Sequence, residues 1–175
     1  MPFTVFHLGP ALALGLLLRR YIHVPTFILA NVLIDIEPLL VLVLDLNYSL
    51  HGYLHTLLFA SMFGAVLGYT MYLLEKVFRP LYRALHLVPE NPIKIKSFIV
   101  AGVSGSVLHV LLDSPLYHDI KPFYPIHNCN PLLNPNLTTI IYSICIFTGL
   151  IGVAYYIYLL LSEKSKPLIS RIQRG

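Results

Sequence analysis

Five apolar segments, separated by polar connections, most strongly constrain how this chain can fold. They cover residues 3–18, 24–44, 50–74, 98–117 and 138–161. A helix needs about 20 apolar residues to cross the hydrocarbon core of a membrane. The first segment is shorter, so we expect it to be tilted, buried or placed where the bilayer is locally thinner. The pattern predicts an all-α integral membrane protein, built as a bundle of about five transmembrane helices.

The composition favours a single transmembrane domain. Of the 175 residues, 57% are hydrophobic and 11% are charged, whereas a soluble domain carries roughly a quarter charged residues. We assign residues 1–161 to one transmembrane helical domain and residues 162–175 to a basic cytoplasmic tail. Gly64 and Gly68, and Gly102 with Ser106, have the spacing that lets helices approach closely. The sequence does not indicate an oligomeric state.

The distribution of Lys and Arg residues predicts the orientation of the helices. All but one of the 12 lie in the first connection, the third connection or the tail, and the exception is Lys121. The positive-inside rule places these basic parts in the cytoplasm. We therefore expect a multi-pass protein of the cell membrane, with its amino terminus outside and its carboxyl terminus inside. His23 and His86 share the basic side and are interpreted as interfacial. The basic residues flank membrane segments, so no nucleic-acid partner is expected.

Titratable side chains interrupt or flank several apolar segments. Such groups are costly within a membrane and usually mark a functional site. His51 and His55 have the i, i+4 spacing that places two side chains on one helix face, and so do His109 and Asp113. In the predicted topology these groups gather toward the outer side. Asp35 and His109 match in depth and would form the floor of a cavity that opens outward.

The combination of imidazole and carboxylate groups predicts a metal site. Both groups suit zinc or another divalent ion, and a metal ion lowers the pKa of a bound water to about 7. There are more candidate ligands than one ion requires, so the site could hold two or three ions bridged by Asp35 or Asp113. The predicted ligands are His7, Asp35, His51, His55, His109, Asp113 and His118.

Asp35 and Glu37, the two predicted catalytic residues, are expected to have different roles. Residues two positions apart point to different faces of a regular helix, so only one of the carboxylates should reach the metal. We assign Asp35 as a ligand and general base. Glu37 would hold a ligand histidine in one tautomer. Pro38 disfavours the helical conformation at Glu37 and predicts a kink in this segment.

Four motifs within residues 3–125 resemble those of the membrane-bound metal-dependent hydrolases, relatives of the LexA-regulated inner-membrane hydrolase of bacteria. They are Phe6-His7-Leu8-Gly9, Ile34-Asp35-Ile36-Glu37, His51 to Thr56, and His109 to Ser114. This chain has Ile34 where the family pattern has proline, and Gly52 where it usually has arginine. The order of the His and Asp residues also looks like that of zinc-dependent phospholipase C and its nuclease relatives. The resemblance implies a multinuclear zinc site that cleaves phosphoesters.

These features predict a membrane-embedded metal-dependent hydrolase whose outward-facing site cleaves a lipid-linked or envelope phosphoester. Membrane lipid and a lipid-linked substrate are the expected partners. A metal or proton transporter is an alternative, although the cytoplasmic halves of the segments carry few polar groups for a pathway. A metal-stabilised scaffold without catalysis is a third possibility, because structural and catalytic sites use the same ligands. Residues 118–136 would form either a lid or an ordinary loop.

Overall fold

A computed structural model of the protein describes residues 5–88 and 94–172, with the backbone alone described for residue 5 and for 163–172. All regular elements in this part of the chain are helices. The α-helices are α1 (Leu8–Leu17), α2 (Val24–Leu33), α3 (Ile36–Val43), α4 (Leu57–Leu73), α5 (Glu75–Ala84), α6 (Ile95–Asp113) and α7 (Thr138–Ile172). Short 3-10 helices are η1 (Val5–His7), η2 (Tyr53–His55) and η3 (Pro135–Leu137). The predicted all-α fold is therefore confirmed for the described residues.

Three of these helical stretches are long and apolar enough to cross a membrane, namely Val24–Val43, Ile95–Asp113 and Pro135–Ser162. A fourth is reached if α4 and α5 count as one span, although α5 bends 85° away from α4. α1 is apolar but has only 10 residues. Each of the five predicted segments contains a helix, yet the described residues supply three to four spans rather than five. The apolar helices indicate membrane association.

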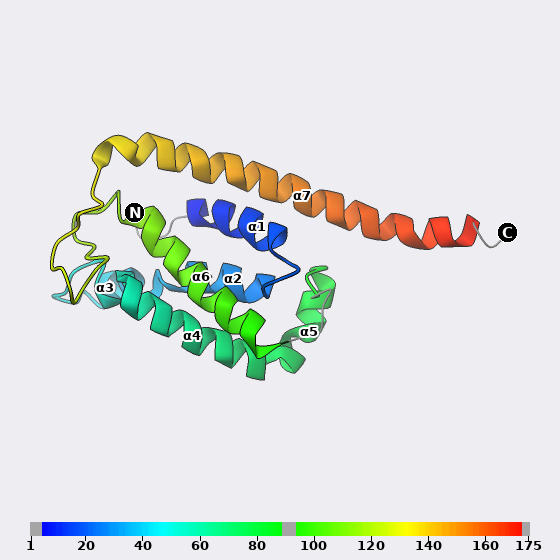
Figure 1. Ribbon diagram of the computed structural model, residues 1–175, viewed down its shortest axis with the longest axis horizontal. Helices are drawn as coiled ribbons and strands as arrows, with labels where there is room; N and C mark the ends of the chain where they lie inside the picture. Colours follow the sequence, from blue (N-terminus) through cyan, green and yellow to red (C-terminus); the bar gives the residue numbers. More distant parts are fainter. Residues whose placement is uncertain (1–4, 89–93, 173–175) are drawn as a thin grey trace.

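α6 lies at the centre of the bundle, where it packs against α4 and α2, and α1 packs between α2 and α7 (Figure 1). The α4–α6 pair is the tightest of these contacts. A Cβ atom on Gly64 would collide with the backbone of Gly102, and one on Gly68 would collide with the backbone of Phe98. The small residues thus allow the helix backbones to touch, as their spacing predicts.

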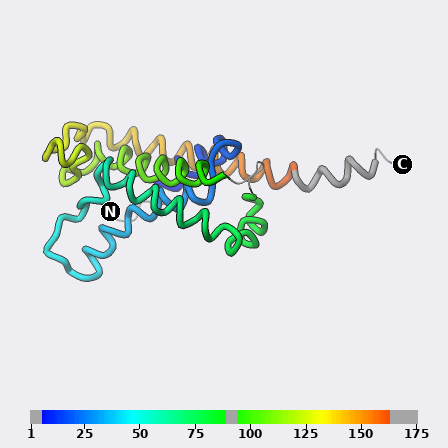
Figure 2. Tube along the Cα trace, turned by 60° about the horizontal axis from the view of Figure 1, so that its bottom comes forward, coloured from blue at the N-terminus to red at the C-terminus, as the bar shows by residue number. Residues whose placement is uncertain are grey.

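The connections 44–56 and 114–137 lie at the same end of the bundle in both views (Figures 1 and 2). We call this the cluster end. α7 packs along α1 and remains helical through Ile172, so a helix continues into the predicted basic tail. The final three residues of that tail lie outside the described residues.

The span Val24–Val43 is broken between α2 and α3, at Ile34 and Asp35. Pro38 has no N–H group to donate to the Ile34 carbonyl. The Glu37 N–H donates to that carbonyl instead, at 3.3 Å, and the Leu39 N–H donates to the carbonyl of Asp35 at 3.1 Å. The kink that Pro38 predicts is therefore present one turn before the proline, and it places Asp35 at the break.

A second buried polar group lies at the opposite end of the bundle. The His23 ring is 1% exposed, stacks on Phe98 with ring centroids 3.9 Å apart, and shares a 2.8 Å hydrogen bond with Thr26 Oγ1 through Nδ1. Burial lowers the pKa of His23 to about 4. Protein thus encloses the ring of His23, whereas His86, the other histidine interpreted as interfacial, is exposed.

Candidate metal centre

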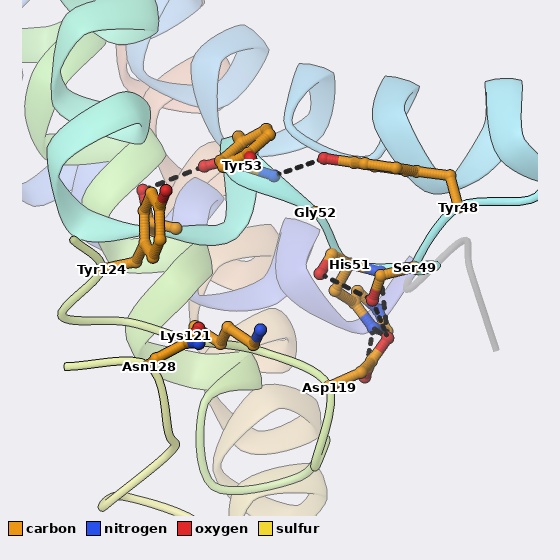
Figure 3. Close-up of a pocket in the computed structure, with 10 residues that line it drawn as sticks. Tyr48, Ser49, His51, Gly52, Tyr53, Asp119, Lys121, Tyr124 and Asn128 are labelled. Atoms are coloured by element: carbon orange, nitrogen blue, oxygen red, sulfur yellow. Dashed lines mark hydrogen bonds and ion pairs between the residues drawn. The ribbon is translucent and has the colours of Figure 1, made fainter.

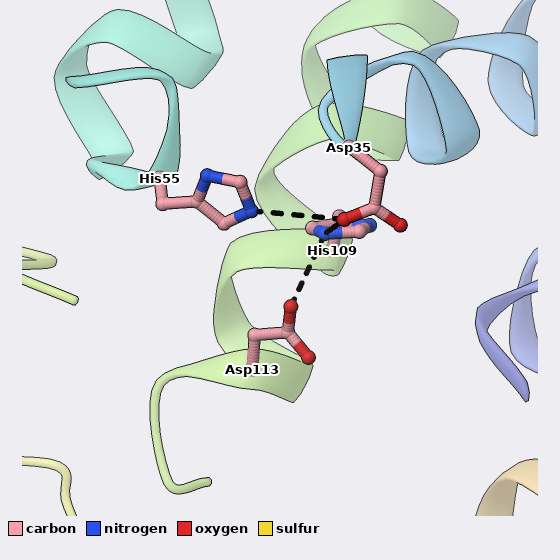
Figure 4. Close-up of side chains that lie close together, drawn as sticks. All are labelled: Asp35, His55, His109 and Asp113. Atoms are coloured by element: carbon pink, nitrogen blue, oxygen red, sulfur yellow. Dashed lines mark ion pairs between the residues drawn. The ribbon is translucent and has the colours of Figure 1, made fainter. Parts of the chain in front are cut away.

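Four buried side chains from three parts of the chain converge at the cluster end of the bundle (Figure 4). Asp35 comes from the break between α2 and α3, His55 from η2, and His109 and Asp113 from α6. One potential ligand atom from each lies within 4.8 Å of the others. None of the four residues is more than 5% exposed. The sequence predicted all four as ligands, and this buried cluster could hold a metal ion.

His109 Nε2 is the central atom of the cluster. It lies 3.3 Å from Asp35 Oδ1 and 3.3 Å from Asp113 Oδ2. His55 Nε2 lies 3.9 Å from the same Asp35 oxygen. Both Nε2 atoms are buried without a hydrogen-bond partner among the described residues, as is Asp113 Oδ1. Because a buried polar atom without a partner is costly, the converging donor atoms fit a cation that would satisfy them together.

Glu37 fixes the orientation of the His55 ring. Its carboxylate accepts hydrogen bonds from the backbone N–H groups of Gly52 and Leu54, both at 3.1 Å. Its Oε2 also lies 3.0 Å from His55 Nδ1. This contact places a proton on Nδ1, which donates a hydrogen bond to Glu37, and Nε2 then faces Asp35. Glu37 therefore contacts the ring of His55, the histidine contact predicted for it, and is not one of the four clustered residues.

His51 and His55 do not share the face of a regular α-helix, as their spacing predicted. Both precede α4, because Thr56 has an extended backbone and caps that helix, accepting from the Phe59 N–H at 3.2 Å. The two rings still lie close, with centroids 4.7 Å apart. The corresponding prediction for His109 and Asp113 is confirmed, since both belong to α6 and their side chains meet.

Asp119 supports His51 in the way that Glu37 supports His55. His51 Nδ1 lies 2.9 Å from Asp119 Oδ1, and the His51 backbone N–H donates to Oδ2 at 3.0 Å. Burial raises the pKa of Asp119, but hydrogen bonds from the His51 backbone and ring outweigh it and lower the pKa below its ordinary value. Sequence reasoning gave Asp119 no role. The available signal was its carboxylate, which closely follows Asp113 at the same end of α6.

His7 and His118, the remaining predicted ligands, have different positions. His7 is 2% exposed, and its Nε2 lies 3.1 Å from Asp113 Oδ1. Asp113 thus has His109 beside one oxygen and His7 beside the other. His118 is exposed in the turn after α6, where the neighbouring Asp119 and Ile120 point inward instead. The fold does not bring His118 to the buried cluster.

The donor set is the main guide to the chemistry of this centre. Imidazole nitrogens and carboxylate oxygens in one buried group suit zinc and other borderline divalent ions. The rings of His55 and His51 each contact a carboxylate through Nδ1, from Glu37 and Asp119 respectively. Such a contact is typical of metal-ligating histidines. No family model matches the chain, and neither the curated proteins nor the solved structures provide a match.

Proposed function

We propose that this protein is a membrane-embedded, metal-dependent hydrolase that cleaves a lipid-linked or envelope phosphoester, with zinc as its metal. The observation that carries the proposal is the convergence of buried potential ligand atoms from the four residues of the cluster inside an apolar bundle. Buried titratable groups in membrane helices usually mark functional sites. Neighbouring carboxylates hold two of the imidazoles in position, as in known metal centres.

Asp35, His55, His109 and Asp113 would hold the first ion. His7 and His51 extend the donor set, so that two or three ions could be accommodated, with Asp113 bridging. When bound, a divalent ion would lower the pKa of a water molecule and offset the negative charge of a phosphoester.

Asp35 is assigned as the general base. It contacts the two histidines of the cluster through one oxygen, Oδ1. Its other oxygen lies on the side away from His55 in Figure 4. We assign that oxygen to accept the proton of the attacking water. Glu37 contributes indirectly, by fixing His55.

The site is proposed to face the outside of the cell membrane, with the amino terminus outside and the carboxyl terminus in the cytoplasm. The support is the basic asymmetry, because Lys121 is the only Lys or Arg in the two connections at the cluster end. Single cysteines at Asn47 and at Lys94, in a chain without Cys129 and Cys145, would test the orientation in intact cells. A membrane-impermeant thiol reagent should label position 47 only, and labelling of position 94 alone would reverse the topology.

The direct test of the hydrolase proposal is release of phosphate or headgroup from a panel of lipid-linked phosphoesters. The purified protein would be assayed in detergent with excess zinc, beside a His109→Ala variant as the matched inactive control. Release by the wild type that is lost in the variant supports the proposal. A zinc-loaded wild type that releases nothing from any substrate would favour a metal-stabilised scaffold, a role that fits the almost complete burial of the cluster.

One observation favours a second candidate, a metal or proton transporter. Contrary to the sequence interpretation, buried polar side chains continue from the cluster toward the opposite end along α2. Asp35, Asn31, Thr26 and His23 are all at most 5% exposed. Asn31 Nδ2 donates to the Gly105 carbonyl at 3.1 Å, while its Oδ1 is buried without a partner among the described residues. Zinc or proton uptake into proteoliposomes, abolished by Asn31→Leu without loss of bound metal, would identify a transporter.

A further inference from the structure

A cavity of about 330 Å³ lies beside the metal centre, between the connections 44–56 and 114–137 (Figure 3). His51 borders both the cavity and the cluster. Its ring lines the cavity, and the same ring lies 4.7 Å from that of His55 in the cluster. The cavity and the cluster therefore meet at His51. The volume of the cavity is at the lower end of the range of about 300–1,000 Å³ for small-molecule sites. A cavity of this size suits a polar headgroup rather than a lipid chain.

The lining supplies one positive charge, from Lys121. The backbone at this position is anchored, because Ile120 is fully buried and the neighbouring Pro122 carbonyl accepts the Leu57 N–H at the start of α4, at 2.9 Å. The Tyr124 N–H donates to the Lys121 carbonyl at 3.1 Å. Lys121 is thus held on a fixed turn, and its side chain lies between Tyr124 and Asp119 at the cavity wall.

The nearby negative charge is already engaged. Asp119 lines the cavity, but its two oxygens contact the ring and backbone N–H of His51, and the Ser49 hydroxyl donates to Oδ2 at 3.4 Å. Lys121 has no acidic partner among the described residues. Its ammonium group is therefore available to an anion that enters the cavity, and an ammonium is a common partner of phosphate oxygens.

The rest of the lining suits an organic group attached to such an anion. The rings of Tyr48, Tyr53 and Tyr124 form a row, with centroids 6.3 Å and 5.4 Å apart in that order. The Tyr48 hydroxyl accepts the Tyr53 N–H at 3.2 Å. A Cβ atom on Gly52 would collide with the Tyr48 ring, so the glycine leaves the ring in place against the wall. The row offers aromatic faces and hydroxyl groups together.

We propose that this cavity is the headgroup subsite of the hydrolase, and that it takes a phosphate-bearing polar headgroup whose phosphate pairs with Lys121. The proposal rests on the proposed function, because it assigns the substrate of that centre to the phosphate-headed lipids. The tyrosine row covers the organic part of the headgroup. The apolar part of the substrate stays in the membrane beside the bundle.

The test measures binding of glycerol phosphate, a soluble headgroup, to the zinc-loaded protein in detergent by calorimetry. Lys121→Met should weaken the affinity by about tenfold, the scale of one charge-assisted contact. Lys121→Arg keeps the charge and should retain most of the affinity. Lys96→Met, an exposed lysine at the opposite end of the bundle, is the matched control and should bind like the wild type. Elemental analysis of each variant should give the wild-type metal content.

Equal binding by Lys121→Met and the wild type would overturn the proposal, because phosphate would then contact the metals alone. Failure of the wild type to bind glycerol phosphate would overturn it as well. Loss of metal in Lys121→Met would instead assign the lysine to the integrity of the metal centre and contradict the subsite. Lys121-dependent binding without hydrolysis of any phosphoester would support the subsite while removing the proposed function, so the two failures are distinguishable.

Discussion

The Nε2 atom of His109 lies 3.3 Å from Oδ1 of Asp35, and this contact joins the C-terminal part of α6 to the break between α2 and α3. The imidazole nitrogen nevertheless has no hydrogen bond among the described residues. The two side chains are thus close enough for an ion pair and also face a shared centre. His55 and Asp113 border the same centre. Such an arrangement could hold a metal ion.

Asp35 should matter more for turnover than Glu37. Asp35→Asn preserves shape but removes the charge that binds metal or accepts a proton, so phosphoester turnover should fall by about 10² or more, the scale of general-base help. Glu37→Gln keeps acceptors for the Gly52 and Leu54 N–H groups and should cost less. Initial rates at saturating zinc measure both effects. Equal losses would refute the separation of roles.

Asp119 should tune metal affinity without being a ligand. Asp119→Asn removes the charge behind His51 and should weaken zinc binding by about tenfold, the lower end of the usual effect of such supporting groups. Competition with a zinc chelator measures the affinity. Asp45→Asn, an exposed aspartate in the other connection at the cluster end, serves as the control. Unchanged affinity in Asp119→Asn would mean that His51 does not contact the metal.

The α4–α6 contact should be required to hold the two halves of the centre together. Gly64→Ala forces a Cβ atom into the Gly102 backbone and should destabilise the protein by about 1–3 kcal/mol, the cost of overpacking. At Gly149 the nearest atom to a new Cβ is 3.4 Å away, an ordinary contact, so Gly149→Ala is the matched control. Thermal unfolding in detergent compares the two. A Gly64→Ala protein as stable as this control would contradict the packing.

His23 should make stability sensitive to acid. Its folded pKa of about 4 lies below the ordinary histidine value of 6.5, so the unfolded chain binds the proton more readily. Stability should therefore fall as the pH drops from about 6.5 toward 4. His23→Phe keeps a ring against Phe98 and cannot titrate, so its melting temperature should fall less over this range. Parallel curves for variant and wild type would contradict the assignment of a neutral, buried His23.

Much of the cluster could be predicted because the spacing of residues along the sequence determines which side chains meet. His109 and Asp113 are neighbours one turn apart on α6. Pro38 accounts for the break in the helix at which Asp35 lies close to them. The partner of His51 could not be predicted in this way. Asp119 reaches it from a connection without regular structure, where no periodicity relates a residue to its direction. The same irregular turn explains why His118 points outward, one residue away from Asp119.

The number of spans was harder to predict than the helical class. Hydropathy marks where helices form, and each predicted segment contains one. It does not report where a helix bends or how early it ends. α4 begins only after its capping residue Thr56, and α5 bends away from α4 directly after α4 ends. These local events shorten the apolar helices without changing the apolar character of the sequence.

Elemental analysis of purified wild-type protein, beside three variants, tests the metal centre most directly. We predict at least one bound divalent ion, most readily zinc, in the wild type, and loss of most of it in His109→Ala and in Asp113→Ala. His118→Ala should keep its metal, because that side chain is exposed and apart from the cluster. The contrary result would be substoichiometric metal in the wild type and the same amount in all three variants.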